Sequence, residues 1–216
     1  MLTQNEVISY TARGINFERL NAVLEYAGHS ILDVCCGSGA YVLELEKDYD
    51  IRGVDIHQYE PWEARPHLFS ISDATELDWK DNSVDTILSF ETLEHLQAPE
   101  KALREYYRVC RKNIILTVPN CELTPAMHQS FLIYYPWLDR THVQFFTMET
   151  ITDMVKGVGF KIIKNYYINQ ISLLPFVTEA FDMSGIGGRL IRKLLLNRQK
   201  HRYYLTCLVV AEKEEN

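Results

Sequence analysis

The residues best suited to chemistry surround a short glycine-containing stretch, ILDVCCGSG at residues 31–39. Aliphatic residues and Asp33 lead into Gly37 and Gly39, and a helix-like pattern follows at residues 41–46. Glycine allows close backbone approach and unusual φ values, and the first turn of a helix presents unpaired N–H donors. Strand, glycine loop and helix in this order predict a ligand-binding crevice at the carboxyl edge of a parallel sheet.

A dinucleotide is the first ligand to test against this loop. The fingerprint G-x-G-x-x-G, read from Gly37, requires a small residue where Val42 stands. When it is read from residue 35, its first glycine is replaced by Cys35. Neither register fits, and this disfavours NAD or FAD.

Acidic residues at the ends of later apolar runs favour another ligand. Asp55 closes a second run 22 residues after Asp33, and Asp73 follows a third run at residues 67–72. Asp85 opens a fourth run at residues 84–89.

Together these residues resemble the class I S-adenosylmethionine-dependent methyltransferases, in the type 11 or UbiE-like subgroup. The family pattern is D-x-G-C-G-[ST]-G after strand 1, an acid ending strand 2, an acid after strand 3, and D-x-[VI] in strand 4. The resemblance covers about residues 15–168, with Cys35 in place of the usual first loop glycine. It implies an α/β fold: a Rossmann-like, doubly wound, mostly parallel seven-stranded sheet with an antiparallel last strand.

The resemblance also implies S-adenosylmethionine as cofactor and S-adenosylhomocysteine as product. Asp33 would support the loop and the cofactor amino group, Asp55 would accept hydrogen bonds from the ribose hydroxyls, and Asp73 from the adenine amino group. The cofactor-binding residues so implied are Asp33, Cys35, Gly37, Ser38, Gly39, Asp55, Ile56, Asp73, Ala74, Ser89 and Phe90.

Methyl transfer from a sulfonium is an in-line displacement, so the protein must mainly align the reacting atoms, and a base is needed only for a protonated nucleophile. The acid–base candidates are Glu91 and His95, with Glu94 between them, and His142. His142 belongs to a stretch that resembles a recurrent H-x-x-[FY]-[FY]-[ST] motif of the family. Packing or capping is the competing interpretation for each, Cys36 is interpreted as a packed loop residue, and the sequence predicts no metal site.

The surrounding pattern predicts the elements that position these residues. Residues 1–29 are expected to be helical, with Tyr10 and Arg13 near the cofactor or on the surface. Prolines at 61 and 66 predict a short or irregular crossover. The remaining expectations are a helix at 100–111, a turn at 111–113, strands at 114–118, 160–167 and 203–212, and a helix capped by Thr147.

Composition bounds the class of protein. A chain of 216 residues, 47% apolar, fits one α/β domain over 1–216, with cap insertions at 121–141 and 169–202. The net charge of −7 disfavours general polyanion binding, and the five cysteines, none in a C-x-x-C pair, indicate the reduced thiols of a cytoplasmic protein. No apolar run reaches the roughly 18 residues needed to span a bilayer. A monomer and a homodimer both remain open.

The favoured function is methylation of a small-molecule or lipid-linked metabolite, with oxygen as the family's expected target. Residues 189–202 carry six Arg or Lys residues and no acid, which suggests contact with a peripheral membrane surface or an anionic substrate. A membrane-associated quinone or glycolipid methyltransferase and a non-catalytic cofactor-binding subunit are the alternatives. A nucleic-acid acceptor is less favoured, because no recognition module accompanies the basic residues, and a dehydrogenase is less favoured still.

Overall fold

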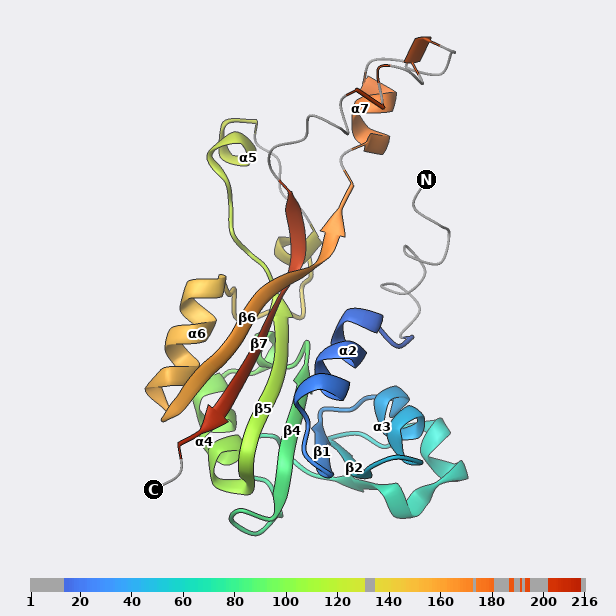
Figure 1. The fold of residues 1–216 in the computed structure, drawn as a ribbon, viewed down its shortest axis with the longest axis vertical. Helices are drawn as coiled ribbons and strands as arrows, with labels where there is room; N and C mark the ends of the chain where they lie inside the picture. The colour runs from blue at the N-terminus through green and yellow to red at the C-terminus, as the bar shows by residue number, and fades with distance from the viewer. Residues whose placement is uncertain are drawn as a thin grey trace.

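A seven-stranded sheet in the order β3-β2-β1-β4-β5-β7-β6 organises the chain (Figure 1). This computed structural model describes residues 14–130, 135–172, 174–180, 187–188, 191, 193–194 and 202–214. The strands are β1 (Ser30–Val34), β2 (Asp50–Asp55), β3 (Phe69–Ile71), β4 (Val84–Phe90), β5 (Cys110–Pro119), β6 (Phe160–Ile171) and β7 (Tyr203–Lys213). β7 runs antiparallel to β5 and β6, and the other pairs are parallel, so the predicted fold class is confirmed.

Helices cover both faces of the sheet, α4 and α6 on one and α2 and α3 on the other (Figure 1). The α-helices are α2 (Phe17–Tyr26), α3 (Ala40–Leu45), α4 (Pro99–Val109), α5 (Pro125–Gln129), α6 (Met148–Gly157) and α7 (Leu174–Ala180). Short 3-10 helices are η1 (Glu60–Ala64), η2 (Pro66–Leu68), η3 (Leu93–His95) and η4 (Tyr135–Trp137).

The central strands are buried on both faces, and their side chains alternate between two apolar cores. In β5, Ile114 and Leu116 pack in the core beneath α4 and α6, whereas Ile115 packs in the core beneath α2 and α3. This burial explains why the strands appear in the sequence as continuous aliphatic runs rather than alternating patterns.

The predicted irregular crossover after β2 is confirmed. Pro61 is the second residue of η1 and Pro66 the first of η2, and no full α-helix forms between β2 and β3. Trp62 lies buried within η1. Thr147 caps α6, as predicted, by accepting a hydrogen bond from the backbone N–H of Thr150.

The boundary between α4 and β5 differs from the prediction. The helix ends at Val109, and residues 111–113, expected as a turn, are already part of β5. Asn113 explains this, because its side chain is buried between two elements. Its amide donates to the carbonyl of Tyr26 (2.6 Å) and accepts from the hydroxyl of Thr86 (2.6 Å).

The end of β6 also differs from the prediction. The strand continues to Ile171, paired with Tyr203, so the segment 169–202 begins as strand rather than as an insertion. Tyr10 and Arg13 lie outside the described residues, as does most of the basic segment 189–202. Among the helices the structure describes, none combines the length and apolar character needed to cross a bilayer.

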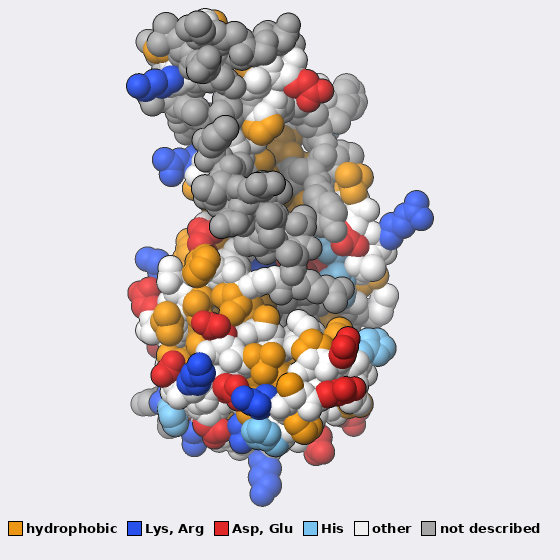
Figure 2. Space-filling view, turned by 90° about the vertical axis from the view of Figure 1, so that its right-hand side faces the viewer, with side chains coloured by type: hydrophobic (Ala, Val, Ile, Leu, Met, Phe, Trp, Pro, Cys, Tyr) orange, Lys and Arg blue, Asp and Glu red, His pale blue; other side chains and the backbone are white. Residues whose placement is uncertain are grey.

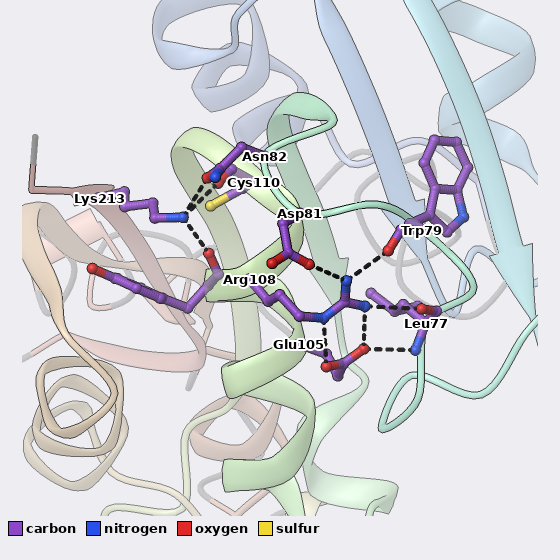
Figure 3. A network of polar contacts seen from close by, with 9 residues as sticks. Leu77, Trp79, Asp81, Asn82, Glu105, Arg108, Cys110 and Lys213 are labelled. Carbon is purple, nitrogen blue, oxygen red and sulfur yellow. Dashed lines mark hydrogen bonds and ion pairs between the residues drawn. The ribbon is translucent and has the colours of Figure 1, made fainter.

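Arg108 fastens the loop between β3 and β4 to α4 (Figure 3). Its guanidinium donates to the carboxylates of Glu105 and Asp81 and to the carbonyls of Leu77 and Trp79, over 2.6–2.9 Å. The Glu105 carboxylate also accepts from the backbone N–H of Leu77 (2.9 Å). Three of the five guanidinium N–H groups thus hold the loop that carries Asp73 at its start, and the other two bind Glu105 on the same helix.

Candidate cofactor and acceptor site

The glycine loop is held from both sides by groups of neighbouring elements. The backbone N–H of Gly37 donates to the carboxylate of Asp55 (3.0 Å), and the indole N–H of Trp62 donates to the Gly37 carbonyl (2.9 Å). The other Asp55 oxygen accepts from the N–H of His57 (3.2 Å). Asp55 is only 6% exposed, so the carboxylate at the end of β2 is fixed in place.

Three residues of the loop adopt left-handed backbone angles. These are Cys35 (φ +58°), Gly37 (φ +55°) and Gly39 (φ +81°). A Cβ on Gly39 would lie 2.4 Å from the Phe69 ring, whereas a Cβ on Gly37 would meet nothing within 4 Å. The backbone at Gly37 therefore faces open space, as a loop that cradles a ligand must.

Asp33 at the end of β1 lies behind this loop. It is 3% exposed, and burial, with the nearby Asp55 charge, raises its pKa to about 8. No hydrogen bond to the Asp33 carboxylate is found among the described residues. A buried carboxylate of this kind fits an ammonium group as its partner, because a cation would stabilise the ionised form.

The residues predicted to hold adenine and ribose lie at the ends of β2 and β3. Asp73 is exposed, and one of its oxygens accepts two hydrogen bonds from Thr75, which lower the Asp73 pKa. Ala74 is buried beside it, and Ile56 is 55% exposed directly after β2. An exposed aliphatic side chain after β2 and a small side chain after β3 suit apolar contact with a planar ring. Together with the open space at Gly37, these residues fit S-adenosylmethionine.

Ser89 and Phe90, predicted to lie beside the methyl group, are the last two residues of β4. The Ser89 hydroxyl is buried and lies 3.2 Å from the Tyr106 hydroxyl, so this side chain joins the core. Phe90 packs against Tyr41, with ring centroids 4.8 Å apart, and against the guanidinium of Arg19.

Arg19 of α2 was missed by the sequence analysis. Its guanidinium, only 13% exposed, forms a 2.6 Å ion pair with Glu91, which has a left-handed φ of +52° directly after β4. A single arginine in an amphipathic helix does not by itself indicate a buried ion pair. Trp62 lies between the two prolines that predict an irregular crossover, and no pattern in the sequence predicted its contact with the glycine loop. The contacts of both residues depend on the tertiary fold.

The two loop cysteines are poor nucleophiles. Burial raises the pKa of the Cys35 thiol to about 12 and that of Cys36 further still. Both therefore remain protonated near neutral pH, in agreement with the interpretation of Cys36 as a packed residue.

Glu91, Glu94, His95 and His142 come together beyond the end of β4. The Glu94 carbonyl accepts from the backbone N–H groups of Val143 (2.8 Å) and Gln144 (3.0 Å), which joins η3 to the segment after η4. The rings of His95 and His142 lie edge to face, 5.0 Å between centroids. The two predicted histidines, 47 positions apart in sequence, are thus neighbours.

A separate hollow of about 510 Å³ lies at the ends of β5, β6 and β7. Its lining includes none of the predicted cofactor residues. The lining residues are Asn120, Glu122, Thr124, Pro125, Ala126, Tyr167, Arg202, Tyr203 and Tyr204. Several belong to the segments predicted as cap insertions, 121–141 and 169–202.

Comparison with known proteins agrees with this geometry. Ajmaline N-methyltransferase of Rauvolfia serpentina is 32% identical over 112 residues, 45% of this chain and 38% of that protein. The O-methyltransferase cnsE of Penicillium expansum is 26% identical over 188 residues, 78% of this chain and 65% of that protein. The chain thus spans less than two thirds of the length of these curated relatives.

Solved structures share the fold. A SAM-dependent methyltransferase from Archaeoglobus fulgidus superposes with a TM-score of 0.67 at 19% identity, over 97% of this chain and 100% of that one. The [4+2]-cyclase SpnF superposes with a TM-score of 0.60 at 19% identity, over 93% of this chain and 80% of that one. A family model described as a methyltransferase domain matches residues 9–165. With the loop, its acids and the sheet order, this match shows that the chain belongs to the class I S-adenosylmethionine-dependent methyltransferases.

Proposed function

We propose that the chain transfers the methyl group of S-adenosylmethionine to a small-molecule or lipid-linked acceptor, at an oxygen atom. The hollow at the ends of β5, β6 and β7 carries this proposal. Its volume of about 510 Å³ lies in the range of small-molecule sites, which is roughly 300–1,000 Å³. Tyr167 and Tyr204 stack within it (centroids 5.9 Å apart), and Glu122 and Arg202 supply charges of both signs.

The names of the curated relatives bear on the atom that is methylated. The Rauvolfia protein is named for N-methylation and the Penicillium protein for O-methylation, and the second aligns with more of this chain. Oxygen is favoured because a hydroxyl must lose its proton on methylation, and the carboxylates and imidazoles after β4 are groups that assist such a loss.

Charge distribution disfavours a broad nucleic-acid groove. On the face shown in Figure 2, acidic and basic side chains are interspersed rather than gathered by sign. Polyanion binding usually requires a basic patch or stripe.

A lipid-linked acceptor at a membrane surface is the second candidate, and the basic segment 189–202 favours it. Among its described residues, Lys193 and Arg202 are exposed. Sedimentation with vesicles of anionic lipid should pull down the wild type more than the triple variant Arg189→Glu, Arg192→Glu, Lys193→Glu. Equal binding of the two proteins would remove this candidate.

Cofactor binding is tested by calorimetry with S-adenosylmethionine. We expect saturable binding by the wild type, retained by Asp48→Ala and weakened at least tenfold by Asp55→Ala, because the Asp55 carboxylate fixes the loop and faces the ribose site. If the wild type does not bind S-adenosylmethionine, or if Asp55→Ala binds it equally well, the proposed methyltransferase activity is contradicted.

Transfer is then tested with methyl-labelled cofactor and a matched panel of phenols, hydroxy acids, amines and lipid-linked phenols. Label in a hydroxylated small molecule or lipid supports the proposal. Label only in amines contradicts oxygen as the target. Wild type that binds cofactor but labels no member of the panel, and labels nucleic acid instead, overturns the acceptor class.

A further inference from the structure

Three side chains beyond the end of β4 are placed as the ligands of a metal ion would be. One carboxylate oxygen of Glu94 and one ring nitrogen each of His95 and His142 all lie within 4.8 Å of one another. The hydrogen bonds from Val143 and Gln144 to the Glu94 carbonyl hold the two contributing segments together. Backbone hydrogen bonds thus fix the relative position of the two segments that carry these three side chains.

The two histidines present the same ring nitrogen to the cluster. Nδ1 of His95 lies 3.1 Å from the carbonyl oxygen of Thr141, and Nδ1 of His142 lies 2.9 Å from that of Pro136. Because a carbonyl only accepts, each Nδ1 carries the hydrogen, which leaves the Nε2 lone pair in the neutral ring. Metal-binding histidines are oriented in this way, with the second N–H fixed by a carbonyl or a carboxylate.

Glu94 supplies an independent observation. It is 1% exposed, and neither carboxylate oxygen has a hydrogen-bond partner among the described residues. Burying such a group without a partner is costly, and buried charges in proteins are paired or coordinate metals. The nearest candidate partner is Nε2 of His95, at 3.7 Å from Oε1, which is beyond hydrogen-bond distance.

We propose that Glu94, His95 and His142 bind a divalent first-row transition-metal ion. Two imidazoles with one carboxylate favour such an ion over Mg²⁺ or Ca²⁺, which prefer oxygen ligands. Metal–ligand bonds of about 2.0–2.2 Å require the cluster to contract by roughly 1 Å. The exposed His95 side chain leaves room for that movement.

Three protein ligands leave coordination positions open, as catalytic rather than structural sites do. Asp139 lies beside the cluster, with Oδ2 3.7 Å from Nε2 of His142 and Oδ1 accepting from Thr141. The cluster begins four residues after Phe90, the residue that the family resemblance places beside the methyl group. The open positions therefore suit an oxygen donor of the methyl acceptor, a role that rests on the proposed function.

The competing explanation is that Glu94 and His95 share a proton and that no metal ion is bound. It accounts for Glu94 and His95, and His142 is then oriented by the Pro136 carbonyl and by Asp139 alone. The two explanations differ in whether the intact chain takes up a metal ion through all three residues.

Co²⁺ is the probe, because its visible absorption reports nitrogen and oxygen coordination. Full-length protein, stripped with chelator, is titrated with Co²⁺ and followed by absorption, by bound cobalt after gel filtration, and by thermal unfolding. The variants are Glu94→Gln and His142→Ala, with Glu100→Gln and His67→Ala, both exposed, as matched controls. Azide is then added to probe open positions.

We expect one Co²⁺ per chain, a rise in melting temperature, and a spectral change on adding azide. Affinity should fall at least tenfold in Glu94→Gln and His142→Ala and stay unchanged in both controls. No stoichiometric uptake, or wild-type affinity in both ligand variants, overturns the site. Thermal scans without metal show whether Glu94→Gln and His142→Ala fold. If one of these variants does not fold, the cobalt affinity of the other tests the site.

Calorimetry with S-adenosylmethionine separates this proposal from the proposed function. Cobalt uptake without cofactor binding would sink the methyltransferase activity and leave the metal site standing. Cofactor binding without cobalt uptake would overturn the metal site and leave the methyltransferase activity standing.

Discussion

At the scale of single residues, Cys35 is the departure from the family pattern with the clearest structural consequence. It keeps the left-handed φ of +58° where the family usually has glycine. An L residue in this conformation costs about 1–2 kcal/mol, because its Cβ crowds the following carbonyl. The loop therefore holds a non-glycine residue in a strained left-handed conformation at this position.

Cys35→Gly should relieve that strain. Glycine also has greater freedom in the unfolded chain, roughly 0.5–1 kcal/mol, and both Cys35→Gly and Cys35→Ala lose the thiol that packs against the core, so we expect Cys35→Gly to be about 0.5 kcal/mol more stable than Cys35→Ala. Urea unfolding of the wild type, Cys35→Gly and Cys35→Ala measures it. Alanine retains the Cβ and should not stabilise, so a glycine variant less stable than the alanine variant would contradict the explanation.

At the scale of elements, the loop between β3 and β4 depends on α4 for its position. It carries Asp73 and Ala74, and the guanidinium of Arg108 binds its two carbonyls at Leu77 and Trp79 (Figure 3). The same arginine lowers the pKa of Glu105 through their paired hydrogen bonds. The loop that carries the predicted adenine-binding residues is thus positioned by side chains of α4.

Arg108→Lys should loosen this loop. Lysine keeps the charge but lacks the planar fork, so contacts to at least two acceptors are lost. Since Arg108 is partly exposed, we expect a loss of about 1–2 kcal/mol in the free energy of unfolding, together with weaker binding of S-adenosylmethionine. Arg104→Lys, exposed on the same helix, is the control, and equal behaviour of the two variants would refute the role of Arg108.

At the scale of the whole molecule, the buried acids of the site are linked to global stability. The folded protein holds Asp33 with a pKa of about 8, against 3.8 in an unfolded chain. Between these values the folded state keeps a proton that the unfolded state has lost. The contribution of Asp33 to the free energy of unfolding is therefore greatest below about pH 4, and it decreases as the pH rises toward 8.

Asp33→Asn should flatten that dependence. Urea unfolding at pH 5 and pH 7.5 should show the wild type losing stability with pH, by at most about 1.4 kcal/mol per unit from this group. The variant should lose less over the same interval. Asp48→Asn, on an exposed loop, should behave as the wild type, and a variant slope equal to that of the wild type would mean that Asp33 ionises freely.

The sequence by itself determined the fold class, the cofactor loop and the acids at the strand ends. These features are local: an aliphatic run marks a strand buried on both faces, and a strand-end acid is placed by the strand that precedes it. The same reasoning placed the boundary between α4 and β5 and the end of β6 wrongly. Both depend on pairing partners far along the chain, the first on Asn113 and the second on the long register of β6 with β7.

Only the tertiary structure decided which distant side chains meet. Nothing in local periodicity joins Arg19 to Glu91, Trp62 to the Gly37 carbonyl, or Glu94 to His142, because each contact crosses between elements that the sheet order brings together. The sequence predicted no metal site for the same reason. In the sequence α4, β5, α5 and η4 lie between His95 and His142, and the chain must fold before the ligand atoms of the three residues come close together.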